Sequence, residues 1–335
     1  MSFLTFGEIM LRLTPPVSGE KLYGSSVFAV NYAGSESNVA SSLAILGNSV
    51  QFITKVPDNT IGDNAIRSLT NYGVDVAQIK KGGERLGTYF VELGSSIRPS
   101  RVIYDRKFSA FSQIDVNEFD WQEILEGKSW LFVSGITAAV SDSCAEATIA
   151  LVAQAKKLNV NVAFDFNYRR TLWSDNLKAR QVFDRILEHT DLLLGNVGGL
   201  IDVYDMKING SNETEMAHHG IQLTAAQFGL KQIAFTIREH NSASSNRLGA
   251  VFFNEGKTYI SPNYTVDITD RFGSGDAFAA SILHALNKGW DNQKIINFAA
   301  AAFALKHTIP GDQHTSPEHE IISIMEGNTS GHVIR

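Results

Sequence analysis

The segment Asp270-Arg271-Phe272-Gly273-Ser274-Gly275-Asp276 stands directly before an amphipathic stretch of the chain. In that stretch Phe278, Ile282 and Leu286 recur at every fourth position, which predicts a helix that begins at or near Asp276. Two glycines before a helix allow the backbone to turn sharply and to approach a ligand closely. Because the first turn of a helix has free N–H groups and the positive end of the dipole, the segment predicts an anion-binding turn.

An aspartate in such a turn lies within reach of whatever the anion is bonded to. Gly273, Ser274, Gly275 and Asp276 are therefore candidate catalytic residues for phosphoryl transfer: their amides hold the charge, and the carboxylate accepts a proton from the attacking hydroxyl. The same pattern is also typical of a plain loop with a helix cap. It is neither a Walker A loop, because no Gly-Lys-Ser/Thr follows, nor a dinucleotide fingerprint, which should follow the first strand of its unit.

Strands and helices alternate along most of the remaining chain. We expect strands at 3–8, 50–53, 131–133, 160–166, 192–194 and 232–237, and helices at 38–46, 144–158, 177–189, 277–286 and 294–307. This alternation is typical of an α/β fold with a parallel sheet covered on both faces. The segments at about 10–33 and 87–106 do not fit it and predict a small β subdomain inserted into the main one. The polar stretch 239–247 is predicted to be a mobile loop.

Composition excludes several classes of protein. The chain has 335 residues, a net charge of −6 and scattered basic residues, which is unlike a nucleic-acid-binding surface. Its single cysteine, Cys144, excludes an intrachain disulfide and a thiolate metal cluster. We find neither a secretory signal nor an apolar run long enough for a membrane span, and we expect a cytoplasmic protein without a membrane partner.

Two separated motifs carry a resemblance to a known family. The segments 33–40 (Ala-Gly-Ser-Glu-Ser-Asn-Val-Ala) and 270–278 resemble the two signatures of the ribokinase-like, pfkB-type carbohydrate kinases. The resemblance implies one Rossmann-like, doubly wound, mostly parallel α/β domain over residues 1–335, with a small β-sheet lid. It also implies ATP and Mg²⁺ as cofactors and Asp276 as general base. We further expect a homo-oligomer, a dimer through the lid.

Within the family, the segments 85–90, 98–106, 165–173 and 308–312 resemble kinases of 2-keto-3-deoxygluconate. A carboxylate substrate favours guanidinium ligands, and Arg106 and Arg169 are the candidates. Asn38 is expected either to bind sugar hydroxyls or to cap the helix behind it. The complete set of expected substrate-binding residues is Gly34, Asn38, Tyr89, Tyr104, Arg106, Arg169 and Asp312.

On the nucleotide side the resemblance implies Asn196, Thr236, Arg238 and Asn297, together with Gly273 and Gly275, and an adenine near Val266. The family's Asn-x-x-Glu segment reads Asn196-Val197-Gly198-Gly199 here, so the acid that it ties to Mg²⁺ is missing. Either another carboxylate substitutes, or the nucleotide itself holds the Mg²⁺. A monovalent cation such as K⁺ is expected at Asp270 and Gly311.

The sequence therefore predicts a phosphotransferase with an alcohol acceptor, which converts 2-keto-3-deoxygluconate, a small-molecule sugar acid, to its 6-phosphate. Two alternatives stay open. One is a fructokinase or another sugar kinase of the same family. The other is a sugar-binding regulator without turnover, which the glycine at position 199 favours. A nicotinamide-dependent oxidoreductase would need glycines after its first strand that this chain lacks.

Overall fold

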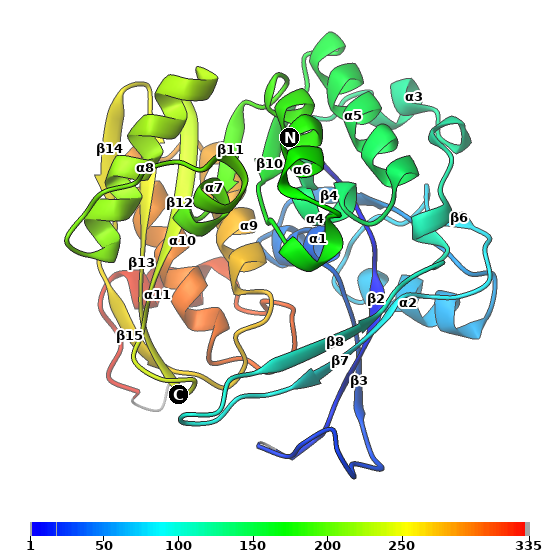
Figure 1. Cartoon of the computed structure of the whole chain (residues 1–335), viewed down its shortest axis with the longest axis horizontal. Helices are drawn as coiled ribbons and strands as arrows, with labels where there is room; N and C mark the ends of the chain where they lie inside the picture. Colours follow the sequence, from blue (N-terminus) through cyan, green and yellow to red (C-terminus); the bar gives the residue numbers. More distant parts are fainter. Residues whose placement is uncertain (1, 18, 332–335) are drawn as a thin grey trace.

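The computed structural model describes residues 2–17 and 19–331 and has a nine-stranded central sheet (Figure 1). The strands are β1 (Ser2–Phe6), β4 (Ser49–Ile53), β9 (Trp130–Ser134), β10 (Asn161–Asp165), β11 (Leu192–Gly195), β12 (Gln232–His240), β13 (Ser245–Asn254), β14 (Lys257–Ile260) and β15 (Tyr264–Asp267). Strands β12-β11-β10-β9-β1-β4 run parallel, and β13 joins β12, β14 and β15 in antiparallel pairs. The prediction of a mostly parallel sheet is confirmed.

Helices cover both faces of this sheet. One face carries α1 (Ser35–Ile45), α2 (Thr60–Thr70), α9 (Ser274–Asn287), α10 (Asn292–Lys306) and α11 (Glu318–Met325). The other carries α3 (Trp121–Leu125), α4 (Gly135–Ala138), α5 (Asp142–Lys157), α6 (Asn176–Leu187), α7 (Val197–Tyr204) and α8 (Glu213–Phe228). No helix of the described residues combines the length and the apolar character that crossing a membrane requires.

Alternation along the strands creates these two cores. In β9, Trp130 and Phe132 pack into the first core, whereas Leu131 and Val133 pack into the second. Successive side chains of a strand point to opposite faces, so a wholly apolar strand supplies both layers. The sheet is thus buried on both sides, and its carboxyl edge is the natural place for a ligand.

A second, four-stranded sheet lies beside the carboxyl edge of the first (Figure 1). It has the order β3-β2-β7-β8, from β2 (Met10–Thr14), β3 (Ala29–Ala33), β7 (Thr88–Glu92) and β8 (Arg101–Asp105), and we call these strands the lid sheet. Strands β2 and β7 are parallel, and the outer pairs are antiparallel. A separate pair, β5 (Lys55–Val56) and β6 (Lys80–Lys81), lies near α2.

The prediction of a mobile loop at 239–247 is wrong. Strands β12 and β13 continue their ladder to the pair His240–Asn246, which leaves only a short turn between them. The polar segment is structured, and its residues His240, Ser242 and Ala243 line a cavity. A polar strand beside a ligand cavity therefore has the composition of a loop.

Candidate active site

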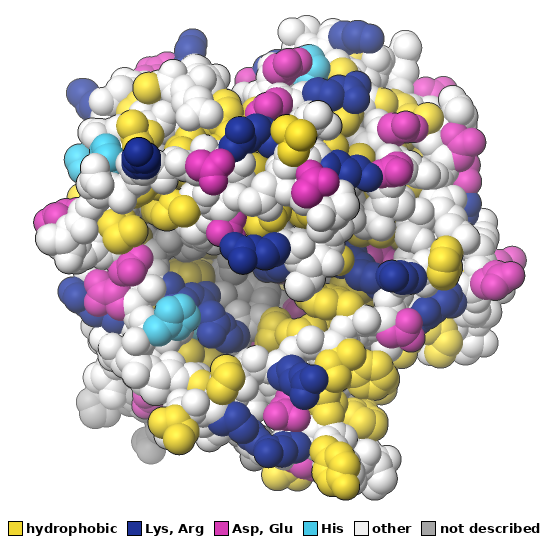
Figure 2. Space-filling view, in the orientation of Figure 1, with side chains coloured by type: hydrophobic (Ala, Val, Ile, Leu, Met, Phe, Trp, Pro, Cys, Tyr) yellow, Lys and Arg dark blue, Asp and Glu magenta, His cyan; other side chains and the backbone are white. Residues whose placement is uncertain are grey.

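Most of the residues proposed from the sequence line one cavity of about 870 Å³. It opens between the lid sheet and the carboxyl ends of the central strands, where Figure 2 shows a hollow with Lys and Arg side chains at its rim. Its lining includes Gly34, Asn38, Tyr89, Tyr104, Arg106, Arg169, Asn196, Thr236, Arg238, Gly273, Ser274, Gly275, Asp276 and Asp312. The fold thus brings together residues that the chain separates widely.

The anion-binding turn begins α9, as the sequence predicts, but the helix starts at Ser274, two residues before Asp276. Gly273 precedes it with a φ of +74°, a left-handed conformation that favours glycine. A Cβ on Gly273 would lie 1.8 Å from the carbonyl oxygen of Asp312. By contrast, a Cβ on Gly275 would meet nothing within 4 Å, so the turn is open toward the cavity at that point.

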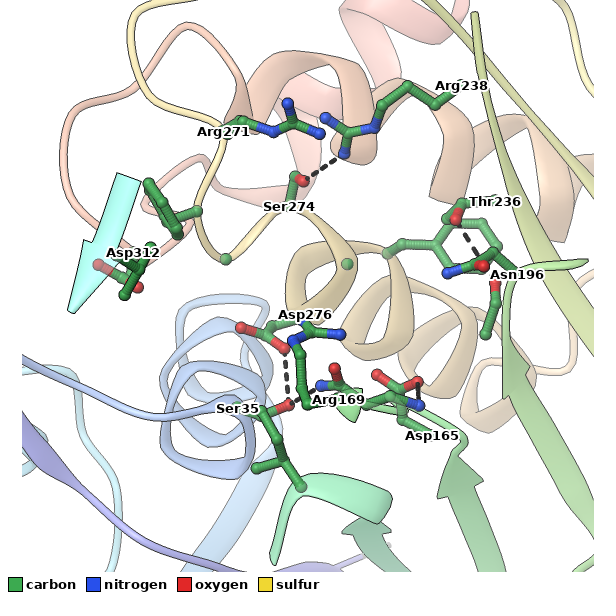
Figure 3. Close-up of a pocket in the computed structure, with 18 of the residues that line it drawn as sticks. Ser35, Asp165, Arg169, Asn196, Thr236, Arg238, Arg271, Ser274, Asp276 and Asp312 are labelled. Atoms are coloured by element: carbon green, nitrogen blue, oxygen red, sulfur yellow. Dashed lines mark hydrogen bonds between the residues drawn. The ribbon is translucent and has the colours of Figure 1, made fainter. Parts of the chain in front are cut away.

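Two side chains hold the Asp276 carboxylate (Figure 3). Ser35 donates to Oδ1 at 2.8 Å, and Asn38 donates to Oδ2 at 2.7 Å. Burial raises the pKa of Asp276 to about 7, although these two hydrogen bonds lower it, and the charges of Asp165 and Asp312 raise it further. Asp276 can therefore accept a proton near neutral pH.

Asn38 serves Asp276 and the main chain instead of facing a sugar. Its Oδ1 accepts from the Gly34 N–H at 3.4 Å and from Gln313 Nε2 at 3.2 Å. Its amide is thus engaged on both sides by the protein itself, and α1 begins after Gly34 without a side-chain cap, so neither sugar binding nor helix capping is confirmed for this residue. Ser35, which sequence reasoning missed, lies in the first signature and also accepts from Asn167 Nδ2 at 3.2 Å.

Arg106 enters the cavity with its charge already balanced. Its Nε donates to Glu8 Oε2 at 2.8 Å, and Nη2 contacts the same oxygen. Ser109 donates to the other Glu8 oxygen at 2.5 Å. The buried Nη1 has no hydrogen-bond partner among the described residues. Glu8 follows the first strand at its carboxyl end, and that position was the available signal for this missed residue.

Tyr89 and Asp312 also bind each other. The Tyr89 hydroxyl donates to Asp312 Oδ1 at 2.9 Å, and Arg12 Nη1 contacts Oδ2. The hydroxyl donor of Tyr89 is therefore already in use within the protein. Tyr104 stacks on Tyr89 with 5.9 Å between the ring centroids and is 40 % exposed, so it is the tyrosine that a ligand can reach.

Arg169 differs from Arg106 in being exposed. It follows β10 and donates through Nη1 to the carbonyl oxygen of Tyr168 at 3.1 Å. Nearby, burial raises the pKa of Asp165 to about 6, which the charge of Arg169 partly opposes. Figure 3 shows Arg169 among the side chains that line the cavity. Its guanidinium group forms no ion pair with the acidic residues that the structure describes.

The opposite end of the cavity carries positive charge without acidic partners. Arg238 donates through Nη2 to Ser274 Oγ at 3.1 Å and lies over the Phe303 ring (Figure 3). Burial lowers the pKa of Arg238 to about 9, and the charge of Arg271 lowers it further. Burial also lowers the pKa of Arg271. Arg271 is part of the quoted motif but was missed, because only the glycines and aspartates of the motif were interpreted.

Some of the remaining residues expected to bind the nucleotide line the cavity, and others do not. Asn196 caps α7 through the Gly198 N–H at 2.9 Å, and the Thr236 hydroxyl donates to the Gly195 carbonyl at 3.4 Å. Both line the cavity. Asn297 does not line it: its Oδ1 accepts from Gln293 Nε2 at 2.8 Å on α10. The predicted adenine neighbour Val266 is also absent from the lining.

The structure explains the glycine at position 199. A Cβ there would lie 2.7 Å from Cδ1 of Phe166, so that ring occupies the space of a side chain. Among the residues described here, no group of three or more His, Cys, Asp or Glu side chains could hold a metal. Mg²⁺ bound mainly through phosphates and water needs no such cage.

The expected K⁺ ligands are occupied by protein donors. Asp270 Oδ2 accepts from Arg12 Nη2 at 2.6 Å and from the Gly311 N–H at 3.1 Å, and Oδ1 accepts from the Phe272 N–H at 3.0 Å. The Asp270 carbonyl faces Lys306 Nζ at 3.5 Å. The residues present therefore do not fit the K⁺ site expected at Asp270 and Gly311.

Comparison with known proteins establishes the family. The model of the pfkB family of carbohydrate kinases matches residues 2–319. The chain belongs to this family. Its structure resembles that of 2-dehydro-3-deoxygluconokinase from Thermotoga maritima, with a TM-score of 0.94, 38 % identity, and coverage of 98 % of this chain and 100 % of the other.

The names of two further relatives describe similar kinase activities. The 2-dehydro-3-deoxygalactonokinase of Haloferax volcanii is 30 % identical over 98 % of each chain. The 5-dehydro-2-deoxygluconokinase of Clostridium beijerinckii is 27 % identical over 91 % of this chain and 86 % of the relative. The names of all three proteins describe kinases of keto-deoxy sugar acids.

Proposed function

We propose that this kinase transfers the γ-phosphoryl group of ATP to the 6-hydroxyl of 2-keto-3-deoxygluconate. The observation that carries the proposal is the position of Asp276, a carboxyl with a pKa of about 7 in an anion-binding turn, between arginines suited to a carboxylate and arginines suited to phosphates. The resemblance to the Thermotoga maritima 2-dehydro-3-deoxygluconokinase supports the substrate, since the two names denote one compound.

The chemistry follows from the turn. Asp276 accepts the proton of the 6-hydroxyl while that oxygen forms a bond to the γ-phosphorus and the bond from phosphorus to the leaving oxygen of ADP breaks. The amides of Gly273, Ser274 and Gly275 stabilise the phosphoryl oxygens in the transition state. Ser35 and Asn38 hold the carboxylate in place, and this positioning reduces the entropy cost of the step.

The acid end of the sugar binds away from the turn. We assign its carboxylate to Nη1 of Arg106, which lacks a partner in the described chain, and to the exposed guanidinium group of Arg169. Tyr104 offers its hydroxyl and ring face. Gly34 lines the cavity beside these groups, and a Cβ on it would lie 1.9 Å from the Glu8 carbonyl oxygen, so the close packing of the backbone requires a glycine there.

The nucleotide phosphates bind at the other end. Arg238 and Arg271 supply charge, while Asn196, which follows β11, and Thr236, within β12, line the same cavity. Mg²⁺ fits as an ion carried by the phosphates, and Asp165 is one of the buried carboxyls that line the same cavity. When bound, the ion neutralises phosphate charge. An adenosine nucleotide and a sugar acid are both cytoplasmic metabolites, and we place the enzyme in that compartment.

We also propose that residues 1–335 form one domain, whose lid sheet closes over the sugar and pairs two copies. The support is apolar exposure on the lid strands: Val30 is 54 % exposed and Ile103 is 43 % exposed. Such side chains are common at interfaces between protein subunits. Light scattering should give a dimer for the wild type and a monomer for Ile103→Asp. A monomeric wild type would contradict the pairing.

A substrate panel tests the proposed reaction. ADP release is measured with 2-keto-3-deoxygluconate, its C4 epimer 2-keto-3-deoxygalactonate and fructose, and NMR locates the phosphate in the product. We expect fructose to be at least about 100-fold poorer in kcat/KM, because it leaves the arginines of the sugar end without a partner. Equal rates with fructose would favour a fructokinase, and no turnover with any sugar would favour a binding protein.

The relative from Haloferax volcanii makes the epimer an informative competitor. Arg169→Met provides the matched control, because it removes charge from the carboxylate end and leaves the turn intact. We expect it to raise the KM for both keto-deoxy acids about tenfold or more and to leave the KM for fructose unchanged. An equal increase in the KM for fructose would show that Arg169 does not bind the substrate carboxylate.

A further inference from the structure

A fully buried cation lies behind the phosphate-binding turn. Lys306 is the last residue of α10, and its side chain is 0 % exposed. Its Nζ donates to the carbonyl oxygen of Ile309 at 2.9 Å and lies 3.5 Å from the carbonyl oxygen of Asp270. Lysine is rarely buried without a paired charge, since removal of an ammonium group from water is costly.

Lys306 belongs to a buried group of four charges, which we call the charge quartet: Arg12, Asp270, Lys306 and Asp312. Arg12 contacts both carboxylates, at 2.6 Å for Asp270. Burial lowers the pKa of Lys306, whereas the charges of Asp270 and Asp312 raise it and favour the ammonium form. Two positive and two negative groups make the quartet neutral.

The quartet fixes the turn from two sides. Asp270 lies three residues before Gly273 in the chain, and the Asp312 carbonyl oxygen packs directly against Gly273. Arg12 comes from β2 of the lid sheet, and Lys306 comes from α10. Lys306 is not part of the cavity lining, so it acts on the reaction only through the residues that it holds. It is therefore a positioning residue.

Main-chain carbonyls close to carboxylates form an oxygen-rich site of the kind that binds an alkali cation. We propose that the ammonium group of Lys306 is a built-in monovalent cation, which holds the turn at Gly273–Asp276 and makes the kinase independent of K⁺. Because the ammonium group is covalently attached to the chain, it loses no translational freedom on binding, and its occupancy of the site does not depend on the salt concentration. The inference rests on the proposed function, and it concerns the same turn.

The first experiment uses the wild-type enzyme with ATP, Mg²⁺ and the sugar acid. Turnover is compared in chloride salts of Na⁺, K⁺ and tetramethylammonium at one ionic strength. We expect kcat and both KM values to agree within about twofold. Activation by K⁺ of about fivefold or more would overturn the inference. Absence of turnover in all three salts would instead contradict the proposed function. The effect of the salts on the melting temperatures of the Lys306 variants, described below, would then test the inference.

The second experiment removes the cation. Lys306→Ala leaves space for an ion, Lys306→Met fills it with an uncharged chain, and Lys157→Met is the control, because Lys157 is the exposed last residue of α5. We expect both Lys306 variants to lose about 10–100-fold in kcat with smaller changes in KM, as for loss of a charged hydrogen-bond donor. The control should keep full activity.

Salt addition then separates charge from packing. NH₄⁺ and K⁺ should raise both the kcat and the melting temperature of Lys306→Ala, should not change Lys306→Met, and should not change the wild type. Tetramethylammonium, which is too large for the site, should restore neither. Full activity of Lys306→Met, or equal rescue of Lys306→Ala by every salt, would contradict a cation role. The melting temperature provides a readout that is independent of turnover.

Discussion

Arginines lie at both ends of the cavity, but only at the sugar end does one of them have an acidic partner. At the sugar end the buried Arg106 pairs with Glu8, whereas the exposed Arg169 forms no ion pair within the described chain. At the phosphate end Arg238 and Arg271 have no acidic partner among the described residues. The Arg106–Glu8 pair at the sugar end is thus formed before the ligand arrives, whereas the charges of Arg238 and Arg271 at the phosphate end are balanced only by a ligand.

Between the two ends stands Asp276, where we expect the largest effect. Asp276→Asn removes the proton acceptor but keeps the shape, so kcat should fall about 10³-fold, within the range for general-base catalysis. The KM values should change much less, since neither end is altered. Steady-state kinetics with both substrates measures this. Turnover within tenfold of the wild type would remove Asp276 from the base role.

The comparison itself is tested by stability. Arg106→Met leaves the Glu8 carboxylate buried and unpaired, which should cost about 3–5 kcal/mol in the free energy of unfolding. Arg238→Met removes a buried charge without stranding an acid, so it should cost nothing or even stabilise the fold. Urea unfolding of the two variants gives both values. Similar losses for both would show that the two ends do not differ in charge balance.

Steady-state kinetics with ATP test the arginines at the phosphate end of the cavity. Arg238→Met and Arg271→Met should each lower kcat/KM for ATP about 10–100-fold, because each loses hydrogen bonds to a charged ligand. The KM for the sugar acid should stay constant. Arg169→Met should show the reverse pattern, since it lies toward the sugar. If Arg271→Met behaved like Arg169→Met, Arg271 would belong to the sugar end.

The pH dependence is the smallest effect. Burial raises the pKa of Asp276 from 3.8 to about 7, and the base must be unprotonated. The kcat/KM should therefore rise about tenfold per pH unit below that pKa and level off above it. Because the folded pKa is raised, ionisation costs stability as the pH rises from about 4 to about 7, so Asp276→Asn should gain stability relative to the wild type over that range. A stability difference between the two proteins that stays constant over this pH range would contradict the raised pKa of Asp276.

The sequence alone determined the layers and the turn. Apolar strands alternate with amphipathic helices, and this local pattern predicts a buried parallel sheet. The residues Gly273, Gly275 and Asp276 also act locally, through backbone freedom and the start of a helix. Their position in the cavity agrees with that interpretation.

Only the tertiary structure decided which charges meet. Glu8 and Arg106 are separated by 98 residues, Tyr89 and Asp312 by 223, and Arg12 and Asp312 by 300. No local period links such residues, so neither the neutralised arginine nor the saturated Tyr89 could be predicted. The burial of Lys306 could not be predicted for the same reason, since a lysine at the end of a helix is expected to be exposed. Secondary structure depends on neighbours along the chain, whereas charge balance in a buried site depends on partners brought together by folding.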